Sequence, residues 1–526
     1  MAQTPDDSAV LRPARDVDTA FFGHPRGLSV LFFSEMWERF SYYGMRAILT
    51  LFMVAPIAAG GMGYSDSKSG LIYGVYTAMV YLLGVPGGFI ADKFLGLRKA
   101  VLYGGVLIML GHISLAIPAE PTFFLGLGLV MIGTGLLKPN ISTMVGGLYA
   151  PEDVRRDAGF SIYYMGINIG AFLSPLVCGY LAESPSFKTF LGGVGIPAHM
   201  SWHFGFGAAA VGMAFGLVQY VAGWRHMGDV GARPYPAKNE AQASRNRFIL
   251  VGILIAVFGI PTLVGVLAAT GMLVVNESRI GLWFSTMLLI LVFGLFGGLL
   301  GLGKWSRDER RRLLVIMLCF WGAIVLWAVF EQAGTTFTLF ASRATNLHWL
   351  GLNLQASWFQ SINAIMVIAF APVFAFIWLR LAKKRRDPST AIKFAIGQVL
   401  LGAGMLLLVP AAEMSMGGIK VSPMWLVGVY LLHTWAELCI SPVGLSAMTR
   451  LAPPAIGGMV MGIWFLGAGV GNYIAGRLGG LYSSFPLDKL LLYQVILPWG
   501  TAVVFFILSR PIKRMLARSE TEKAEM

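Results

Sequence analysis

Charged residues are scarce in this sequence. Asp, Glu, Lys and Arg make up 13% of its 526 residues, whereas 56% are hydrophobic, and the mean hydropathy is +0.70. So few charges could not cover the apolar surface of a soluble protein of this length. Runs of about 20 apolar residues, the length that crosses a bilayer core, recur along the whole chain. The composition therefore predicts an all-α polytopic membrane protein and excludes a soluble one.

Cysteine and histidine are also rare. The three cysteines, Cys178, Cys319 and Cys439, fall inside apolar runs, so neither a disulfide framework nor a CxxC metal site is expected. Histidine is nearly absent from these runs, which leaves carboxylates as the main groups that could carry protons. Enzyme motifs such as HExxH and GxSxG are missing too. We therefore expect no enzymatic activity, no catalytic residues, no metal and no cofactor.

Hydropathy predicts fourteen membrane spans. They are 27–55, 69–91, 99–117, 121–149, 158–182, 203–224, 248–271, 280–302, 312–340, 354–379, 390–411, 422–446, 455–476 and 490–509. Most Lys and Arg residues fall in the N-terminus, in every second loop and in the C-terminus. By the positive-inside rule this asymmetry places both termini in the cytoplasm. The net charge of +14 is thus interpreted as an orientation signal and not as a nucleic-acid site.

The spans group as six, two and six. We expect two six-helix bundles around a central cavity, with an inserted two-helix hairpin that is peripheral and structural. The N-terminal residues lack the apolar core of a signal peptide, so the first span should remain in the mature protein. The predicted organisation is a cytoplasmic N-terminus (1–26), first bundle (27–224), cytoplasmic linker (225–247), hairpin (248–302), second bundle (303–511) and cytoplasmic tail (512–526).

The loop after the second span carries charges between glycines. It resembles the G-x-x-x-D-K/R-x-G-x-R/K loop of the major facilitator superfamily. A carboxylate and cations at a helix end could hold neighbouring helices together on one side of the membrane and release them. A tight, positively charged cytoplasmic turn is the alternative interpretation. The residues of this motif are Gly88, Asp92, Lys93, Gly96, Arg98 and Lys99.

Seven ionisable residues lie inside predicted spans, where charge is costly and by default marks function. Four are acids and three are bases, so one carboxylate is left over after pairing. A surplus acid in a medium of low dielectric constant can carry a proton. The seven residues are Glu35, Glu38, Arg39, Arg46, Lys138, Glu331 and Glu437.

Several of these charges share one face of the first span. At about 100° per residue, Glu35, Arg39 and Arg46 fall on one stripe with Tyr42. Glu38 and Tyr43 flank that stripe. Such a ridge must face protein or water and not lipid. A purely structural ion-pair network between Glu35 and Arg39 remains an alternative.

The motifs together are similar to one known family. Glu35-Met-Trp-Glu38-Arg39-Phe40-Ser-Tyr42-Tyr43-Gly44 resembles the E-x-x-E-R-F-x-Y-Y-G signature of the proton-coupled oligopeptide transporter (POT) family, a branch of the major facilitator superfamily. Residues 160–170 resemble its second signature. Residues 133–140, 330–332, 359–363 and 435–437 fit as well. Fourteen spans with a central insertion are typical of the bacterial members.

The resemblance implies symport of protons with di- and tripeptides, and with peptide-like drugs, by alternating access. It also implies a monomeric, multi-pass protein of the bacterial cytoplasmic (inner) membrane. Proton coupling would involve Glu35, Glu38, Arg39 and Glu331, and Arg46 with Glu331 would form a gating salt bridge. Peptide would bind at Arg39, Tyr42, Tyr43, Arg46, Tyr81, Lys138, Asn168, Trp327, Asn363, Glu437 and Trp464. Animal members carry a histidine where this chain has Gly74, so a histidine-based coupling scheme is not carried over.

Two other functions stay open from the sequence. The same fold could carry another small anion or zwitterion, such as nitrate or an amino acid. A single-ended anion would not need Glu437, so this residue discriminates between the two cargoes. A receptor or sensor on a transporter scaffold is the alternative of another class. For Asn168 and Trp464, simple helix packing is the alternative to a binding role.

Overall fold

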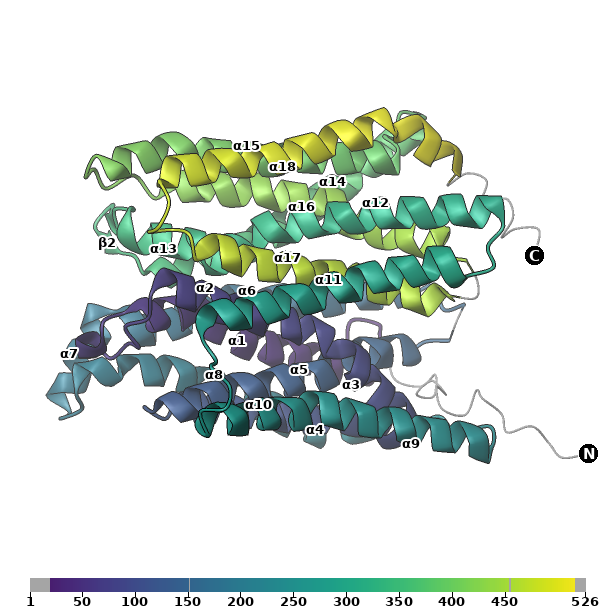
Figure 1. The fold of residues 1–526 in the computed structure, drawn as a ribbon, viewed down its shortest axis with the longest axis horizontal. Coiled ribbons are helices and arrows are strands. Elements are labelled where there is room, and N and C mark those ends of the chain that lie inside the picture. Colours follow the sequence, from purple (N-terminus) through teal and green to yellow (C-terminus); the bar gives the residue numbers. More distant parts are fainter. Residues whose placement is uncertain (1–18, 151, 454–455, 516–526) are drawn as a thin grey trace, which may run out of the picture. The chain divides into compact units, whose positions relative to one another are not determined.

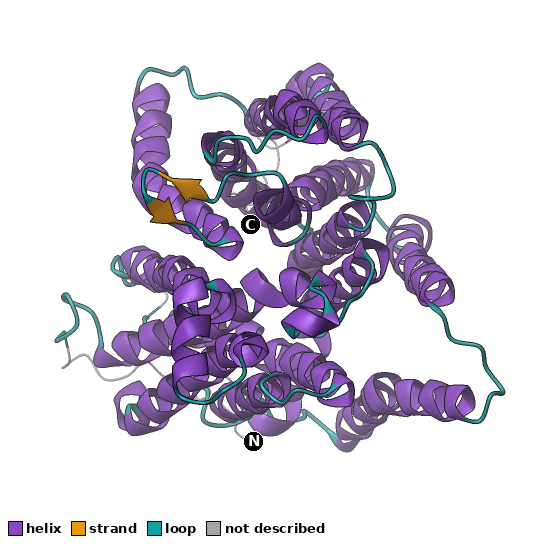
Figure 2. Ribbon diagram, turned by 90° about the vertical axis from the view of Figure 1, so that its left-hand side faces the viewer, coloured by secondary structure: helices purple, strands orange, loops and turns teal. Residues whose placement is uncertain are grey.

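The computed structural model describes residues 19–150, 152–453 and 456–515. Within these residues the chain is almost entirely helical (Figure 1). The two short strands that it contains, β1 (His348–Trp349) and β2 (Leu352–Asn353), form an antiparallel hairpin (Figure 2). The all-α class predicted from hydropathy is therefore confirmed.

The helices follow one another with short connections. Up to the linker they are α1 (Arg26–Val54), η2 (Ile57–Ala59), α2 (Asp66–Leu82), α3 (Gly84–Ile90), η3 (Ala91–Leu95), α4 (Leu97–Leu115), α5 (Glu120–Gly147), α6 (Arg156–Glu183), α7 (Pro185–Gly193), η4 (Ala198–Met200), α8 (Ser201–Ala222) and η5 (Trp224–Met227). The inserted hairpin comprises α9 (Glu240–Leu254), η6 (Ile255–Gly259), α10 (Ile260–Ala269) and α11 (Glu277–Leu302). The remainder comprises α12 (Arg307–Phe330), η7 (Glu331–Gly334), α13 (Thr336–Arg343), η8 (Ala356–Phe359), α14 (Gln360–Lys383), α15 (Thr390–Met416), α16 (Met424–Leu451), α17 (Gly457–Gly479) and α18 (Leu487–Ile507).

Each predicted span overlaps a helix or a helical stretch of these elements, and residue 455 of the span 455–476 lies outside the described residues. Among the described residues, 12 helical stretches are long and apolar enough to cross a membrane. Helices α1 and α4 are not among the 12, and α1 carries Glu35, Glu38, Arg39 and Arg46 within its length. Fourteen crossings, cytoplasmic termini and the domain boundaries therefore stay predictions.

The chain divides into two compact units, which are described separately. Unit 1 comprises Met1–Tyr42, Leu82–Gly170 and Gly207–Ser285, and unit 2 comprises Tyr43–Tyr81, Ala171–Phe206 and Thr286–Met526. The boundary cuts α1 after Tyr42. Unit 2 thus contains helix ends from the first half of the chain together with nearly all of the second half.

Unit 1 is held together by close helix packing. Helices α4 and α5 approach so closely that a Cβ atom on Gly133 would lie 2.6 Å from the carbonyl oxygen of Gly104. A second glycine pair, Gly111 and Gly126, repeats this contact further along the helices. Small residues allow such backbone approach in membrane proteins, where dispersion and not the hydrophobic effect joins helices.

Unit 2 brings helices from both halves of the sequence into contact. Helix α2 packs on α17, and a Cβ atom on Gly476 would lie 2.5 Å from the carbonyl oxygen of Gly70. On α1, the Thr50 hydroxyl donates to the carbonyl of Gly334 at 2.6 Å. Helix α1 ends and α2 begins on the same side of unit 2, and we call this side the distal end. At this end the two halves of the sequence are tied to each other.

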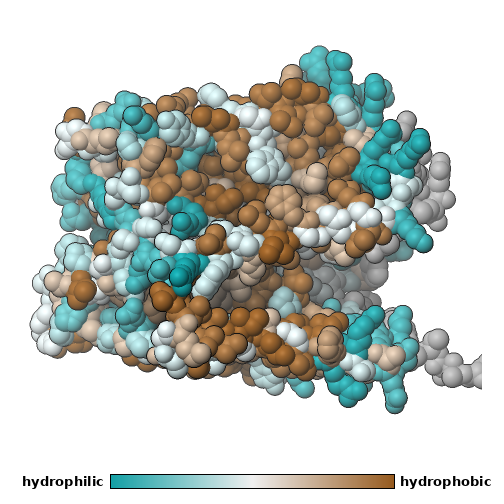
Figure 3. All heavy atoms as spheres, viewed as in Figure 1, coloured by the Kyte–Doolittle hydropathy of each residue, from teal (hydrophilic) through white to brown (hydrophobic). Residues whose placement is uncertain are grey.

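The surface matches a lipid environment. Over the stretch from α9 to α11, hydrophobic side chains cover much of the surface, and hydrophilic ones gather where α9 begins (Figure 3). The most apolar window of the stretch Glu240–Ala269 is 0% buried, although its mean hydropathy is 2.6. An apolar helix that exposes every side is stable in lipid and not in water. This exposure supports a peripheral position for the inserted hairpin.

Candidate functional site

The first functional group of residues is a buried cluster on α1 in unit 1. We call Glu35, Glu38 and Arg39 the carboxylate cluster. One helical turn separates Glu35 from Arg39, and their Oε1 and Nε atoms are 3.0 Å apart. The same Nε lies 2.5 Å from Oε2 of Glu38. All three side chains are buried, and the Arg39 guanidinium stands 5.5 Å from the ring of Tyr42.

The carboxylate cluster has two acids for one guanidinium. Oε2 of Glu35 and Oε1 of Glu38 are buried without a hydrogen-bond donor among the described residues. A buried acceptor that is left unsatisfied costs about 1–3 kcal/mol, and more when it is charged. A bound proton would remove one charge and supply one donor. The cluster is therefore a candidate proton site.

The second group lies in unit 2, where α1 meets α2 and the end of α12. Arg46 and Glu331 form a buried ion pair through Nη2 and Oε2. The Nε of Arg46 also donates to the hydroxyl of Tyr73 at 2.6 Å. We call Arg46 and Glu331 the gate pair. The ring of Tyr43 lies 5.6 Å from the Arg46 guanidinium.

The local chain around Glu331 explains how it reaches Arg46. Helix α12 ends at Phe330, and the chain tightens into the short 3₁₀ turn η7 that begins with Glu331. The turn is anchored by the bond from Thr50 to Gly334. A Cβ atom on Gly334 would collide with the Tyr73 hydroxyl, so only glycine fits this approach.

A third group, also in unit 2, centres on Glu437. The Nδ2 of Asn363 on α14 donates to Oγ1 of Thr434 at 3.0 Å and to Oε2 of Glu437 at 3.3 Å. Both Thr434 and Glu437 belong to α16, which continues through Pro442. The structure thus brings together Asn363 and Glu437, two residues to which the family resemblance gives a role in peptide binding.

The polar residues of α5 and α6 belong to unit 1. Lys138 on α5 is half-buried and lies close enough to Glu38 to exert a favourable electrostatic effect on its carboxylate. Asn168 on α6 is buried, and its Nδ2 donates to the carbonyl of Tyr164 one turn earlier at 3.0 Å. The Asn168 amide thus bonds within its own helix, and its role in peptide binding stays a prediction.

The remaining aromatic candidates lie in unit 2. Tyr81 is near the end of α2, and Trp327 on α12 contacts the ring of Phe330 at 5.6 Å. Trp464 on α17 is buried, and its ring fills the space over Gly444 of α16. The position of Trp464 favours helix packing. A role for these residues in lining peptide pockets stays a prediction.

The loop motif is bound to the linker within unit 1. The chain makes a π-helical turn at η3 and reverses at Gly96, whose φ is +79°. The backbone N–H of Arg98 donates to Gly231 at 2.9 Å, and its Nη2 donates to Val230 at 3.1 Å. The carbonyl of Asp92 accepts from Tyr235 at 2.7 Å. The motif therefore holds the linker, a contact that sequence reasoning did not foresee. Of the other members, Gly88 lies in α3, Lys93 in η3 and Lys99 in α4.

Two contacting residues were missed by sequence reasoning. Tyr73 and Thr434 complete the polar environments of the gate pair and of Glu437. A neutral hydroxyl hardly lowers the hydropathy of a span, so neither stood out. The signal for Tyr73 was its place in the tyrosine-rich second span, directly before Gly74. Within the residues that the structure describes, no cluster of three or more His, Cys, Asp or Glu side chains could hold a metal ion.

Comparisons with known proteins agree with the motifs. A sequence model described as "POT family" matches residues 98–495. A peptide transporter from Yersinia enterocolitica is similar at 39% identity, covering 96% of this chain and 97% of that protein. A di-/tripeptide transporter from Lactococcus lactis is 34% identical, covering 95% of this chain and 98% of the relative.

A solved structure supports the same conclusion. The crystal structure of a POT family transporter in complex with a thioalcohol-conjugated peptide has a TM-score of 0.84 to this chain, with 34% sequence identity. The match covers 96% of this chain and 99% of that one. Charged groups lie on α1, η7 and α16 at the positions that the motifs predict, the family model matches residues 98–495, and the Yersinia relative covers 96% of the chain, so this chain belongs to the POT family of transporters.

Proposed function

We propose that this protein imports di- and tripeptides together with protons by alternating access. Membership of the POT family supports this function, as do the similar proteins named as peptide and di-/tripeptide transporters. The one observation that carries the proton coupling is the pair of donor-less carboxylate oxygens on Glu35 and Glu38. The protein is a multi-pass membrane transporter, and we assign it to the bacterial cytoplasmic membrane, with the distal end outside.

A zwitterionic peptide needs a cation for one end and an anion for the other, because an unpaired charge away from water is prohibitive. Arg39 and Lys138 supply cations, and Glu437 supplies the anion. Asn363 orients the Glu437 carboxylate through its 3.3 Å hydrogen bond. We therefore assign the peptide carboxylate to Arg39 and Lys138 and the peptide amino group to Glu437.

The proton would act by weakening ion pairs. A proton on Glu38 leaves Arg39 with one counterion, Glu35, and frees the guanidinium to bind the peptide carboxylate. A proton on Glu331 would break the gate pair and leave Arg46 with the Tyr73 hydroxyl. Each inward proton contributes about 2.3 kcal/mol per 100 mV of membrane potential, which can drive accumulation of the peptide. Such differential binding shifts the populations of the two access states.

Uptake of labelled dialanine into proteoliposomes with an imposed inward pH gradient tests this function. We expect accumulation that a protonophore abolishes. Peptide exchange without net proton flux should survive the protonophore. Accumulation of dialanine that ignores the protonophore would refute proton coupling. A protein that moves nitrate or a free amino acid but no dialanine would refute the peptide assignment.

A further inference from the structure

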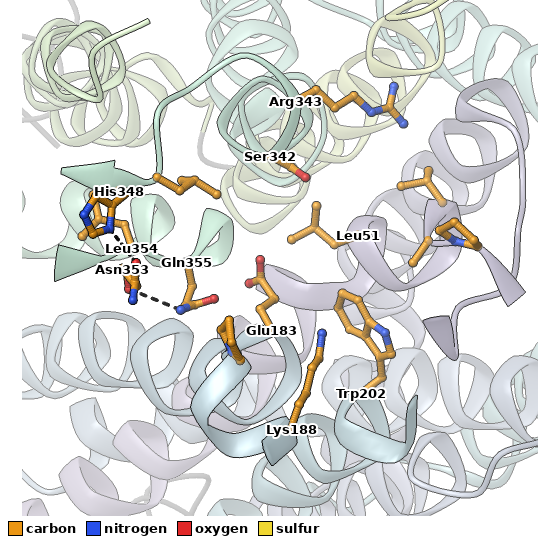
Figure 4. A pocket seen from close by; sticks show the side chains of 15 residues that line it. Leu51, Glu183, Lys188, Trp202, Ser342, Arg343, His348, Asn353, Leu354 and Gln355 are labelled. Carbon is orange, nitrogen blue, oxygen red and sulfur yellow. Dashed lines mark hydrogen bonds between the residues drawn. The ribbon is translucent and has the colours of Figure 1, made fainter. Parts of the chain in front are cut away.

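Unit 2 contains a cavity at its distal end. Its volume is about 610 Å³, within the range of small-molecule sites. The walls come from the ends of α1 and α6, from α7 and α8, and from the segment after α12 (Figure 4). None of the residues predicted to bind peptide lines this cavity. Its labelled lining residues are Leu51, Glu183, Lys188, Trp202, Ser342, Arg343, His348, Asn353, Leu354 and Gln355.

The cavity lies on the distal side of the gate pair. Leu51 follows Arg46 by five residues on α1, a distance of about 7.5 Å along the helix axis. On the other chain segment, Ser342 and Arg343 follow Glu331 through η7 and α13. A solute that arrives from the distal side while the gate pair is closed would meet this cavity first.

Two opposite charges, on Glu183 and Lys188, line the cavity and attract each other without a direct ion pair among the described residues. Each carboxylate oxygen of Glu183 accepts one backbone N–H, from Ala356 and from Ser357, both at 3.2 Å. The ammonium of Lys188 lies 5.8 Å from the ring centre of Trp202. Both charged groups point from one wall toward the middle of the space in Figure 4. No ion pair between Glu183 and Lys188 is present in the described part of the chain.

The other cation in the cavity wall, Arg343, already has a carboxylate partner. Arg343 makes a two-pronged ion pair with Asp66, with both N–O distances 2.7 Å. Its guanidinium also stands 5.3 Å from the ring of Tyr482. Lys188 is therefore the cation that can serve a ligand carboxylate, and the fixed carboxylate of Glu183 has lone pairs left for an ammonium group.

We propose that this cavity is an outer docking site for zwitterionic peptides, separate from the central site. The peptide carboxylate binds Lys188, and the peptide ammonium binds Glu183. Asn353 and Gln355 offer amides to the peptide backbone, and Trp202 covers a side chain. The site holds peptide next to the closed gate and raises its local concentration there. This proposal rests on the proposed function only for its choice of a peptide as ligand.

A cysteine in the cavity wall can report occupancy. Ser342 is exposed on α13, so Ser342→Cys places a thiol in the wall with little change in volume. The three natural cysteines are buried and should not react with a polar maleimide. In lipid nanodiscs, dialanine at about ten times its dissociation constant should slow labelling about tenfold, by mass action. Ser484→Cys, exposed at the same end but outside the cavity, is the matched control and should show no protection.

Charge variants then identify the contacts. In the Ser342→Cys protein, Lys188→Gln should raise the dialanine concentration that gives half-protection about tenfold. This change corresponds to the loss of one charge-assisted hydrogen bond. Lys188→Arg keeps the charge and should keep the protection. Equal protection in the Ser342→Cys protein with and without Lys188→Gln overturns the proposal. Acetate that protects as well as dialanine also overturns it, because a zwitterion site needs both charges.

A central-site variant separates this proposal from the proposed function. Glu437→Ala should abolish uptake of dialanine, yet it should leave the protection of Ser342→Cys intact. Protection that disappears in Glu437→Ala would show that peptide closes the cavity from the central site, and the outer site would be refuted. Failure of the wild-type protein to take up dialanine would refute the proposed function, whereas the labelling experiment would still measure the cavity.

Discussion

Helix α1 carries two buried ionic groups that differ in one respect. The carboxylate cluster has two acids around the Arg39 guanidinium, with Lys138 near Glu38 as a further cation. The gate pair at Arg46, seven residues later, has one acid for one guanidinium, and a tyrosine hydroxyl accepts a further N–H. Both groups are removed from solvent.

The two groups should respond differently to protonation, because they differ in the number of acids around the guanidinium. Arg39 keeps one counterion when either acid takes up a proton, so the carboxylate cluster can load a proton without losing its ion pair. A matched pair loses its partner when the acid is protonated, so the gate pair responds by separating. The same amino acids therefore give a proton carrier in one place and a switch in the other. Identical Glu→Gln substitutions should separate the two roles.

The largest effect is expected at the gate pair. Glu331→Gln leaves the Arg46 guanidinium buried without a counter-charge, and removal of one partner of a buried ion pair costs about 3–5 kcal/mol. We expect a clear fall in the unfolding temperature of the detergent-solubilised protein and loss of driven dialanine uptake. Calorimetry and proteoliposome uptake would measure these effects.

The control for this variant is Glu413→Gln, an exposed position on α15. It should change stability by less than about 0.5 kcal/mol, as surface substitutions usually do. Equal stability of the Glu331→Gln and Glu413→Gln proteins would show that the gate pair does not stabilise the fold.

The second effect concerns transport and spares the fold. Glu38→Gln leaves Arg39 paired with Glu35, so the buried guanidinium keeps a counterion. We expect stability within about 1 kcal/mol of wild type, since one buried charge is removed without leaving another unpaired. Driven accumulation of dialanine should be abolished, whereas counterflow should persist because the amide binds no proton. Intact accumulation of dialanine by the Glu38→Gln protein would show that the coupling proton does not bind in this cluster.

The sequence alone predicted both ionic groups, because charges inside apolar spans are conspicuous. It also placed Arg46 opposite Glu331, although only through resemblance to the POT family. It could not predict Tyr73 as the third member, since a hydroxyl barely alters hydropathy. Helix α7 was likewise missed, because nine residues are too few for a periodic pattern. The distal cavity joins residues that are more than 150 positions apart, so it required the folded structure.

A smaller effect is expected from the third member of the gate group. Tyr73→Phe removes the acceptor for the Nε of Arg46. A hydrogen bond to a charged group contributes about 1.5–3 kcal/mol, so we expect a moderate loss of stability and slower uptake. Tyr430→Phe is the matched control. The Tyr430 hydroxyl is buried without a hydrogen-bond partner among the described residues, so its removal should cost little. If both variants behave alike, Tyr73 does not support the gate pair.

The smallest effect should come from an ion pair that is nearer to solvent. Arg343 and Asp66 pair one base with one acid, as the gate pair does, and make two direct N–O contacts. The Arg343 side chain, however, is 37% exposed. Exposed pairs contribute about 0.2–1 kcal/mol, because water solvates the separated charges well. Asp66→Asn should therefore lower stability by less than about 1 kcal/mol and should lose even this effect in 1 M salt, where charges are screened within about 3 Å. If Asp66→Asn lowers stability as much as Glu331→Gln does, the contribution of the gate pair to stability comes from pairing itself and not from burial. Thermal unfolding of both variants at low and high salt decides between these explanations.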